Sequence, residues 1–555
     1  MSAFRAALRR LPLLLVAIAS PAALAAGADA PGRAPDQALA AKAVATRAPS
    51  TNVDWLVAAS DADIERAFAQ ARAQSRPLLL YWGATWCPPC NQLKANFFNR
   101  QDFAAASRGF VAVHVDGDQR GAQRIGARFK VGAYPTVLLL RAEGSEITRL
   151  PGEVDPERLM EVLRLGMAGG RPAAAVLADF GAGRALAAGE WRMLAFYSWA
   201  TDEQQLVPRA GRPDLLAQLA IAASAPGSAA DADTRARLWL AAVAASDDGR
   251  GIKADAALRQ RVQSVLADPV QARRHADLVA GSAAEIVHAL TDEETAERTR
   301  LLALYADALR RLEGDATLSR GDRIGALIAR IDLARIDRPV DAVEVKLAPA
   351  LLAEVRAHVA RDAREITDGY EREALIPAGA YALARAGLWG ESDALLKASL
   401  ARSHSPYALM IQLAGNARRS GRDDEALAWH ARAFDESKGP ATRLQWGASY
   451  LGALVELAPQ DAARIERVAA QLFDEAGADP GSFAGRSARS LARVGKHLAG
   501  WSAAGGHDAV LERLRRQLDG VCAKVDAADG QREACQKLLA REAAAGVAVG
   551  AASRS

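Results

Sequence analysis

The chain has 555 residues, of which 50% are hydrophobic and 25% charged. This composition is typical of a globular protein with a sizeable core, and the length leaves room for about three or four domains. The formal net charge is only +4, and three of the arginines stand within the first ten residues. We therefore expect neither nucleic acid nor an anionic membrane surface to be the main partner.

Residues 1–25 have the three-part layout of a secretory signal peptide. Three arginines precede an apolar run over residues 11–19, and small residues follow at Ala23-Leu24-Ala25. An N-terminal membrane anchor is the alternative, but the run is shorter than the roughly 20 residues of a membrane span. The sequence therefore predicts cleavage, a mature chain without a membrane span, and a periplasmic or secreted location in which disulfides persist.

Two segments are predicted to lack a core of their own. Residues 26–52 are rich in alanine, proline, aspartate and glycine, which favours a disordered linker. Residues 546–555 are predicted to be a flexible tail. Order is expected to begin near Trp55, with a domain over residues 53–168.

Strands and helices alternate in this first domain. Ser60 and Asp63 form a capping-box pattern before apolar residues at helical spacing, and Ala142-Glu143-Gly144-Ser145 reads as a hairpin turn. The pattern predicts helices from Ser60, after Cys87 and over 119–129 and 155–167, and strands over 78–82, 110–116, 136–141 and 146–150.

The chemistry is concentrated in Trp86-Cys87-Pro88-Pro89-Cys90, which follows the apolar strand 78–82. A helix that begins at Cys87 would stabilise the thiolate of that residue through its amides and its partial positive charge. An attacking sulfur must also be exposed, and the helix start is expected to leave Cys87 so. Cys87 is therefore the predicted nucleophile, and Cys90, one turn deeper, would resolve the mixed disulfide. Pro88 and Pro89 fit the first turn but remove two amide donors, so the Cys87 thiol is expected in the middle or upper part of the roughly 3.5–7.5 pKa span of activated cysteines.

The Trp-Cys-Pro-Pro-Cys motif and the Tyr134-Pro135-Thr136 step, in this order of strands and helices, resemble the thioredoxin superfamily, and above all its exported domains. The resemblance implies an α/β thioredoxin fold and a redox-active Cys87–Cys90 disulfide. It also implies a cis Pro135 lying against the cysteines, where a substrate peptide binds along Tyr134, Pro135 and Thr136. An ordinary trans proline at a strand start is the alternative. Trp86, beside Cys87, is expected to cover the sulfur and to offer substrate an apolar face.

The chain departs from thioredoxin behind the second cysteine. Thioredoxin has a buried aspartate and a partner lysine there, whereas this chain has Tyr81 and Ala112. Loss of both avoids a lone buried charge, which would be costly. Proton transfer at Cys90 would then use water or another group, and His114 is a candidate, with a half-buried strand histidine as the alternative.

Residues 173–545 are rich in alanine, leucine, arginine and glutamate, and they predict an all-α array of helical hairpins. Helices are expected over 213–224 and 232–246, and in a series from 294 to 545. Residues 421–434 resemble the second helix of a tetratricopeptide repeat, with small Ala426 and Ala433 where helices pack closely. A weaker copy follows Gly387, at the spacing of that family. A tetratricopeptide-like α-solenoid is predicted, with an irregular helical domain as the alternative; a solenoid would offer a surface on which a peptide or protein could dock.

Cys522 and Cys535 flank a predicted turn and are expected to form a structural disulfide worth roughly 2–4 kcal/mol. A second redox centre is the alternative, but its spacing lacks a helix-capped geometry. The eight histidines are scattered, and no nucleotide-binding loop or metal-ligand cluster stands out. We therefore expect no metal and no cofactor.

Two functional classes remain open at this point. In the first, the protein is an exported thiol:disulfide oxidoreductase, a reductase or isomerase that exchanges disulfides with exported protein thiols. It would need a redox partner protein as electron donor, and its helical region would select the client. In the second, the protein is an interaction scaffold with the thioredoxin-like domain as a structural or binding module. The two prolines favour a reductant or isomerase, but the sequence does not fix the direction of exchange.

Overall fold

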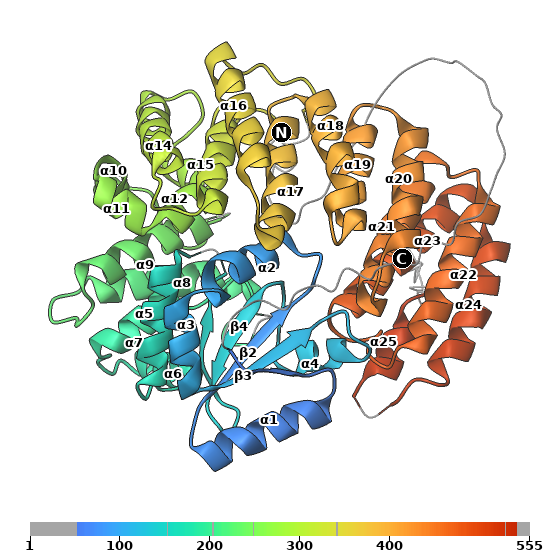
Figure 1. Ribbon diagram of the computed structural model, residues 1–555, viewed down its shortest axis with the longest axis horizontal. Coiled ribbons are helices and arrows are strands. Elements are labelled where there is room, and N and C mark those ends of the chain that lie inside the picture. Colours follow the sequence, from blue (N-terminus) through green and yellow to red (C-terminus); the bar gives the residue numbers. More distant parts are fainter. Residues whose placement is uncertain are drawn as a thin grey trace, which may run out of the picture. The chain divides into compact units, whose positions relative to one another are not determined.

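The computed structural model describes residues 53–540 except 153, 203–204, 248, 340–341 and 528 (Figure 1). The predicted signal peptide, linker and C-terminal tail lie outside the described residues. Contacts divide the chain into two compact units. One comprises the chain up to Gly117 together with Arg128–Glu436, and the other comprises Asp118–Ala127 together with the residues from Ser437 on.

The first domain is built on a five-stranded sheet in the order β1-β3-β2-β4-β5. Strand β3 is parallel to β1 and β2, whereas β4 is antiparallel to both β2 and β5. Residues Leu78–Gly83 of β2 are all buried, as expected for the apolar run in the sequence. The strands are β1 (Trp55–Val57), β2 (Leu78–Gly83), β3 (Val111–Asp116), β4 (Thr136–Leu140) and β5 (Glu146–Leu150).

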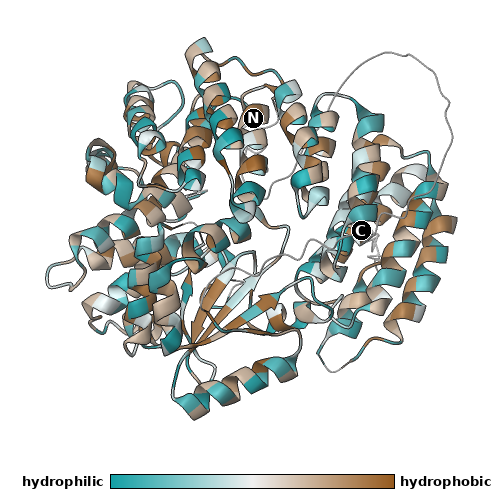
Figure 2. Ribbon diagram, in the orientation of Figure 1, coloured by the Kyte–Doolittle hydropathy of each residue, from teal (hydrophilic) through white to brown (hydrophobic). Residues whose placement is uncertain are grey.

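Helices cover this sheet, whose central strands are drawn mainly in the hydrophobic colour in Figure 2. The predicted capping box at Ser60 and Asp63 is present at the start of α1. The helix after Cys87 continues as a π-helical segment, η2, whose Phe97 and Phe98 pack with Phe103 in an aromatic cluster. The helical elements here are α1 (Asp61–Gln74), α2 (Pro88–Leu93), η2 (Lys94–Phe98), α3 (Gln101–Ala106), α4 (Ala122–Arg128) and α5 (Pro156–Met167).

The rest of the described chain is helical, which confirms an α/β thioredoxin fold followed by a helical array. The predicted segments from 213 to 246 and from 294 on match helices, although α25 ends at Lys537 and residues 541–545 lie outside the described ranges. The sequence missed α6, α7 and the four helices α10 to α13. The helices of the first unit are α6 (Ala173–Gly181), α7 (Ala188–Ala195), α8 (Arg212–Ala223), α9 (Ala232–Ala245), α10 (Ala256–Ala267), α11 (Pro269–Arg274), α12 (Ala276–Gly281), α13 (Ala283–Leu290), α14 (Ala296–Gly314), α15 (Arg320–Leu333), α16 (Pro349–Glu365), α17 (Gly369–Arg385), α18 (Trp389–Ser399), α19 (Pro406–Arg419) and α20 (Asp423–Glu436).

One hydrophobic core runs across the predicted boundary at residues 168–173. It joins residues of the sheet and α5 to apolar side chains as far along the chain as Ala242. The segment 197–202 also bonds to the sheet and to the loop before β4. The amide of Ser198 donates to the carbonyl of Arg149, and the amide of Gly132 donates to the carbonyl of Thr201. The thioredoxin-like sheet and the first helices of the array therefore share one interior. The predicted boundaries themselves stay a prediction.

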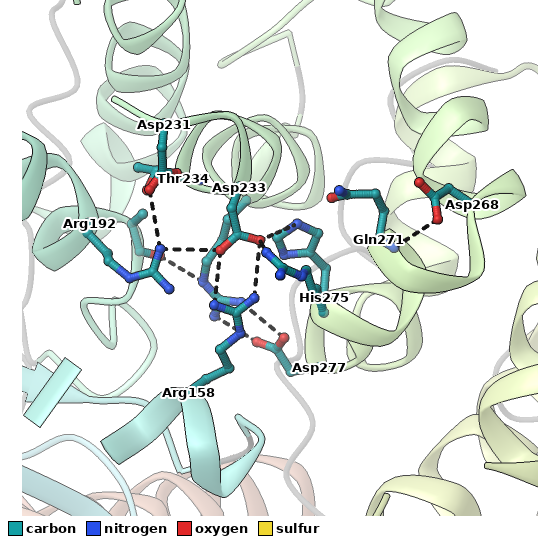
Figure 3. A network of polar contacts seen from close by, with 12 residues as sticks. Arg158, Arg192, Asp231, Asp233, Thr234, Asp268, Gln271, His275 and Asp277 are labelled. Atoms are coloured by element: carbon teal, nitrogen blue, oxygen red, sulfur yellow. Dashed lines mark hydrogen bonds and ion pairs between the residues drawn. The ribbon is translucent and has the colours of Figure 1, made fainter. Parts of the chain in front are cut away.

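A buried ionic network reinforces this junction (Figure 3). The carboxylate of Asp233, in α9, lies 3.2 Å from a guanidinium nitrogen of Arg158 in α5 and 3.3 Å from one of Arg192 in α7. His275, fully buried, lies 3.6 Å from the same carboxylate. Burial lowers the pKa of His275 to about 4, so its ring is neutral at pH 7. With Arg274, a guanidinium nitrogen of which lies 3.5 Å from the same carboxylate, three arginines surround one buried carboxylate where the sheet domain meets the array.

The second unit takes in a short piece of the sheet domain, Asp118–Ala127. Asp118 forms an ion pair with Arg486 at 2.5 Å, and the amide of Gly121 donates to Asp479 at 2.7 Å. The helices of this unit are α21 (Pro440–Leu457), α22 (Ala462–Ala478), α23 (Gly485–Gly505), α24 (Asp508–Cys522) and α25 (Gln531–Lys537). The loop after β3 is therefore held by the C-terminal helices.

Helices α19 and α20 pack as a hairpin, with Ala426 and Ala433 fully buried where the repeat resemblance places small residues. The assignment to a tetratricopeptide-like solenoid stays a prediction. In the part of the chain that the structure describes, no helix has both the length and the apolar character needed to cross a bilayer.

Candidate active site

Cys87 and Cys90 stand at the start of α2 and are joined by a disulfide, with their Cα atoms 5.2 Å apart. Cys87 is the N-cap residue, and Pro88 and Pro89 occupy the first turn. The amide of Cys90 donates to Sγ of Cys87 at 3.2 Å. This is the donor that the two prolines leave in place, and in the reduced protein it would stabilise a Cys87 thiolate.

The disulfide is less exposed than the sequence analysis expects of an attacking sulfur. Cys87 is 3% exposed and Cys90 is fully buried. Ala84, Trp86 and Tyr134 pack around the two cysteines. Near the disulfide, Thr85 and Ala133 are exposed, and Trp86, Pro88, Pro89 and Tyr134 are half-buried.

The Tyr134–Pro135 peptide bond is cis. The Tyr134 ring stacks on Trp82 at 5.6 Å and meets Trp86 edge-on at 6.4 Å, which forms an aromatic group beside the disulfide. The hydroxyl of Thr136 donates to the carbonyl of Ala133 at 2.8 Å and so closes the loop before β4. Of the four residues predicted to bind substrate, Trp86 lies in the cysteine loop, Tyr134 and Pro135 lie in the loop before β4, and Thr136 is the first residue of β4. Pro135 and Thr136 are buried.

Asn91 was not singled out from the sequence, yet it organises the cysteine loop. Its buried side-chain amide donates to the carbonyl of Thr85 at 2.9 Å and to that of Cys87 at 3.1 Å. These two bonds bracket Trp86 and fix the backbone that leads into the disulfide. A buried polar residue directly after the second cysteine was the signal available in the sequence.

Tyr81 occupies the position of the missing aspartate and is fully enclosed. Burial raises the pKa of its phenol, and the hydroxyl has no hydrogen-bond partner among the described residues. His114 stacks on Tyr81 at 4.9 Å and meets Trp55 edge-on. Burial, with the positive charge of Lys94, lowers the pKa of His114 to about 4. The ring is therefore neutral at pH 7 and packs as an aromatic group.

Lys94 lies one turn beyond Cys90, and residues of the helical array contact it. Burial lowers the pKa of Lys94, while the carboxylate of Asp116 opposes this shift. Its ammonium lies 5.3 Å from the ring centroid of Tyr370 in α17. The helical array therefore contacts the helical segment that continues α2, and no local pattern in the sequence could have indicated this contact.

The second cysteine pair lies in the other unit. Cys522, at the end of α24, and Cys535, in α25, are joined by a disulfide and are both buried. All four cysteines of the chain are therefore paired. Across the described ranges, no group of three or more histidine, cysteine, aspartate or glutamate side chains is arranged to hold a metal ion.

Comparison with known proteins points to the same region. Residues 64–166 match the family described as thioredoxin-like domain. The chain is 32% identical to the thiol:disulfide interchange protein DsbD 2 of Pseudomonas aeruginosa over 135 residues, which cover 24% of this chain and 23% of that protein. It is 31% identical to the thiol:disulfide interchange protein DsbD of Klebsiella pneumoniae over 109 residues, or 19% of this chain and 18% of that one.

The chain thus spans about a fifth of the length of these curated relatives. The family match covers most of the region that carries the sheet, and it includes the cysteine pair. Fold, cysteine geometry and sequence similarity agree that the chain contains a thioredoxin-like domain within residues 64–166.

Proposed function

We propose that the protein is a thiol:disulfide oxidoreductase that exchanges disulfides with protein clients through Cys87 and Cys90. The observation that carries this proposal is the cysteine pair at the start of α2, with the Cys90 amide 3.2 Å from Sγ of Cys87. The similarity to thiol:disulfide interchange proteins supports it.

The exchange transfers two electrons from the Cys87–Cys90 dithiol to the client disulfide. The Cys87 thiolate attacks one sulfur of a client disulfide and releases the other client sulfur as a thiolate, which takes up a proton. The Cys90 thiol loses its proton and attacks Sγ of Cys87, which releases the second client thiol and forms the Cys87–Cys90 disulfide. A dithiol partner protein would return the pair to the reduced state. The reverse sequence would oxidise a client, so the direction depends on the potential of the pair.

Each site residue has a role in this proposal. Trp86 and Tyr134 would present an apolar face to the client backbone, and Pro135 and Thr136 would leave the loop before β4 free to pair with an extended segment. Cys522 and Cys535 would be a structural disulfide. An exported location, with residues 1–25 as a cleaved signal, fits a chain in which all four cysteines are paired, since such disulfides persist in oxidising compartments.

The test uses the full-length protein. The redox state of Cys87 is measured by thiol labelling and mass spectrometry across a series of glutathione buffers, and the reduction of a linear peptide dimer linked by a disulfide is followed with dithiothreitol as the donor. The expected result is a reversible two-electron titration and a peptide reduction that Cys87→Ser abolishes. The Cys522→Ser/Cys535→Ser double variant is the matched control and should retain both activities.

A Cys90→Ser variant should accumulate a mixed disulfide between Cys87 and the peptide. The proposal is wrong if the wild-type protein reduces the peptide no faster than Cys87→Ser. The protein would then be an interaction scaffold, and its thioredoxin-like domain a structural or binding module.

A further inference from the structure

Segments of the helical array pack directly against the redox helix. Helix α17 lies along α2, and the side chain of Gln92 fills the space beside Gly321 near the start of α15. Both helices belong to the same compact unit as α2. The flank of α2 that leads away from Trp86 is therefore covered by residues more than 200 positions later in the sequence.

Two specific contacts join the helical array to the segment Thr85–Lys94, one at each end of that segment. At its start, Nε2 of His404 lies 3.1 Å from the carbonyl oxygen of Thr85, the same oxygen that accepts a hydrogen bond from Asn91. At its end, the ammonium of Lys94 lies over the ring of Tyr370. The rings of Tyr370 and His404 also meet edge-on at 6.3 Å. We call Tyr370 and His404 the clasp.

A buried carboxylate fixes the loop that carries His404. Glu373, in α17 one turn after Tyr370, accepts hydrogen bonds from the His404 amide at 2.8 Å and from the Ser403 hydroxyl at 2.9 Å. Both members of the clasp are therefore tied to α17.

The clasp therefore limits the approach to Cys87. The sulfur pair is nearly covered, with Cys87 3% exposed. Beside it, Thr85 and Ala133 are exposed, and Trp86, Pro88, Pro89 and Tyr134 are half-buried. An extended segment can follow the loop before β4 and reach the disulfide. A folded protein with a disulfide on a broad surface would meet α17 and the His404 loop first.

We propose that the clasp makes the redox site selective for extended, unfolded segments over the disulfides of folded proteins. This inference rests on the proposed function. It assigns Tyr370 and His404, which lie outside the thioredoxin-like domain, as residues that determine specificity by exclusion.

The test compares two disulfide substrates with the full-length protein. One is the linear peptide dimer used above, and the other is a small folded protein with a single exposed disulfide. The clasp is removed by Tyr370→Leu/His404→Ala. It is kept by the conservative pair Tyr370→Phe/His404→Gln, which retains an aromatic ring for Lys94 and a side-chain N–H that can reach the Thr85 carbonyl. The exposed neighbour Arg402→Ala is the matched control.

We expect the wild-type protein to reduce the peptide with a much higher kcat/KM than the folded substrate. Loss of two contacts of this kind should raise kcat/KM for the folded substrate by about tenfold and leave the peptide value within about twofold. The conservative pair and Arg402→Ala should keep the wild-type selectivity. A loss of folding would lower both rates together and would not change their ratio.

The inference is overturned if the wild-type protein reduces both substrates equally well. It is also overturned if the clasp variant, with a peptide kcat/KM within about twofold of the wild type, keeps the wild-type ratio. If the double variant loses its activity on the peptide, His404→Ala alone decides in the same way. The inference is also overturned if the conservative pair or Arg402→Ala relaxes selectivity as much as the clasp variant does. A failure of the proposed function is distinguishable, because the wild-type protein would then reduce neither substrate.

Discussion

Arg149 in β5 offers a sharp test of how the sheet is joined to the helical array. Its guanidinium is fully buried and makes five hydrogen bonds of 2.6–3.1 Å. The acceptors are the carbonyls of Phe129, Lys130 and Thr201 and both carboxylate oxygens of Glu146. One side chain therefore ties β5 to the segment before the Tyr134–Pro135 loop and to the chain after α7.

The perturbation is Arg149→Met, which keeps most of the side-chain volume and removes every donor. It leaves the carboxylate of Glu146 without its buried ion-pair partner, and such a break costs about 3–5 kcal/mol. Several carbonyls lose a donor at the same time, which pushes the cost toward the upper end of that range. Arg149→Lys keeps the charge but cannot reach all the acceptors, so we expect an intermediate loss.

The assay is urea unfolding of the full-length oxidised protein, followed by tryptophan fluorescence. With a slope of about 3 kcal/mol per molar urea, the transition midpoint should fall by about 1 M or more. Arg164→Met is the matched control, because that arginine is 57% exposed and its ion pair with Asp102 should contribute no more than about 1 kcal/mol. A midpoint for Arg149→Met equal to that of the control would refute this account of the junction.

Three further substitutions probe the site and the array. Gly117→Ala places a methyl group on the hydroxyl of Tyr134, so exchange with glutathione, measured by thiol labelling, should slow by about tenfold or more while the urea midpoint changes little. Burial lowers the pKa of His358, but two adjacent carboxylates more than offset this and raise it, so its stabilisation is present below the unfolded pKa and is lost as pH rises through the folded one. Urea midpoints at about pH 6 and about pH 8 should therefore differ more in the wild type than in His358→Gln; an equal difference would count against this reading. Cys522→Ser should cost about 2–4 kcal/mol in unfolding free energy and expose one titratable thiol at Cys535 on unfolding; an unchanged midpoint would show that this disulfide is no staple.

The sequence predicted the parts of the site that depend on local chemistry. A run of apolar residues predicts a buried strand. The spacing of the two cysteines, with the prolines between them, predicts a helix that begins at the first cysteine. The helix start at Cys87 and the strand 78–82 were predictable because each depends on residues within a few positions.

Short elements were harder to predict. Helices α11 and α12 have six residues each, too few for a helical period to show, and α11 begins at Pro269 directly after Asp268, which caps it. Periodicity over longer windows therefore could not identify α11 and α12.

The burial of Cys87 could not be predicted from the sequence either, for a different reason. The sequence led us to expect an exposed attacking sulfur, since helix capping alone leaves it open. Ala84, Trp86 and Tyr134 pack around the sulfur instead, and Tyr134 is brought there by tertiary packing. Tyr370 and His404 contact the neighbouring Lys94 and Thr85, also through tertiary packing and not through any repeat or spacing. Long-range packing of this kind leaves no local pattern in a single sequence.

The shared core also decides how the redox activity can be studied. A fragment over residues 50–170 would keep the sheet and both cysteines of the site but would lose the residues that cover its inner face. Four large aromatic side chains of that core follow residue 170, namely Trp191, Phe196, Tyr197 and Trp199. Burial of each contributes about 2 kcal/mol or more, and a domain is stable by only about 5–15 kcal/mol in total.

We therefore expect the 50–170 fragment to lack cooperative unfolding and to bind a hydrophobic dye, whereas the full-length protein unfolds cooperatively. Near-ultraviolet circular dichroism and urea titration measure the difference. A fragment with a sharp transition and a fixed aromatic signal would show that the sheet domain is independent of the array. It would also show that α6 to α9 are not needed to shape the surface of the sheet domain.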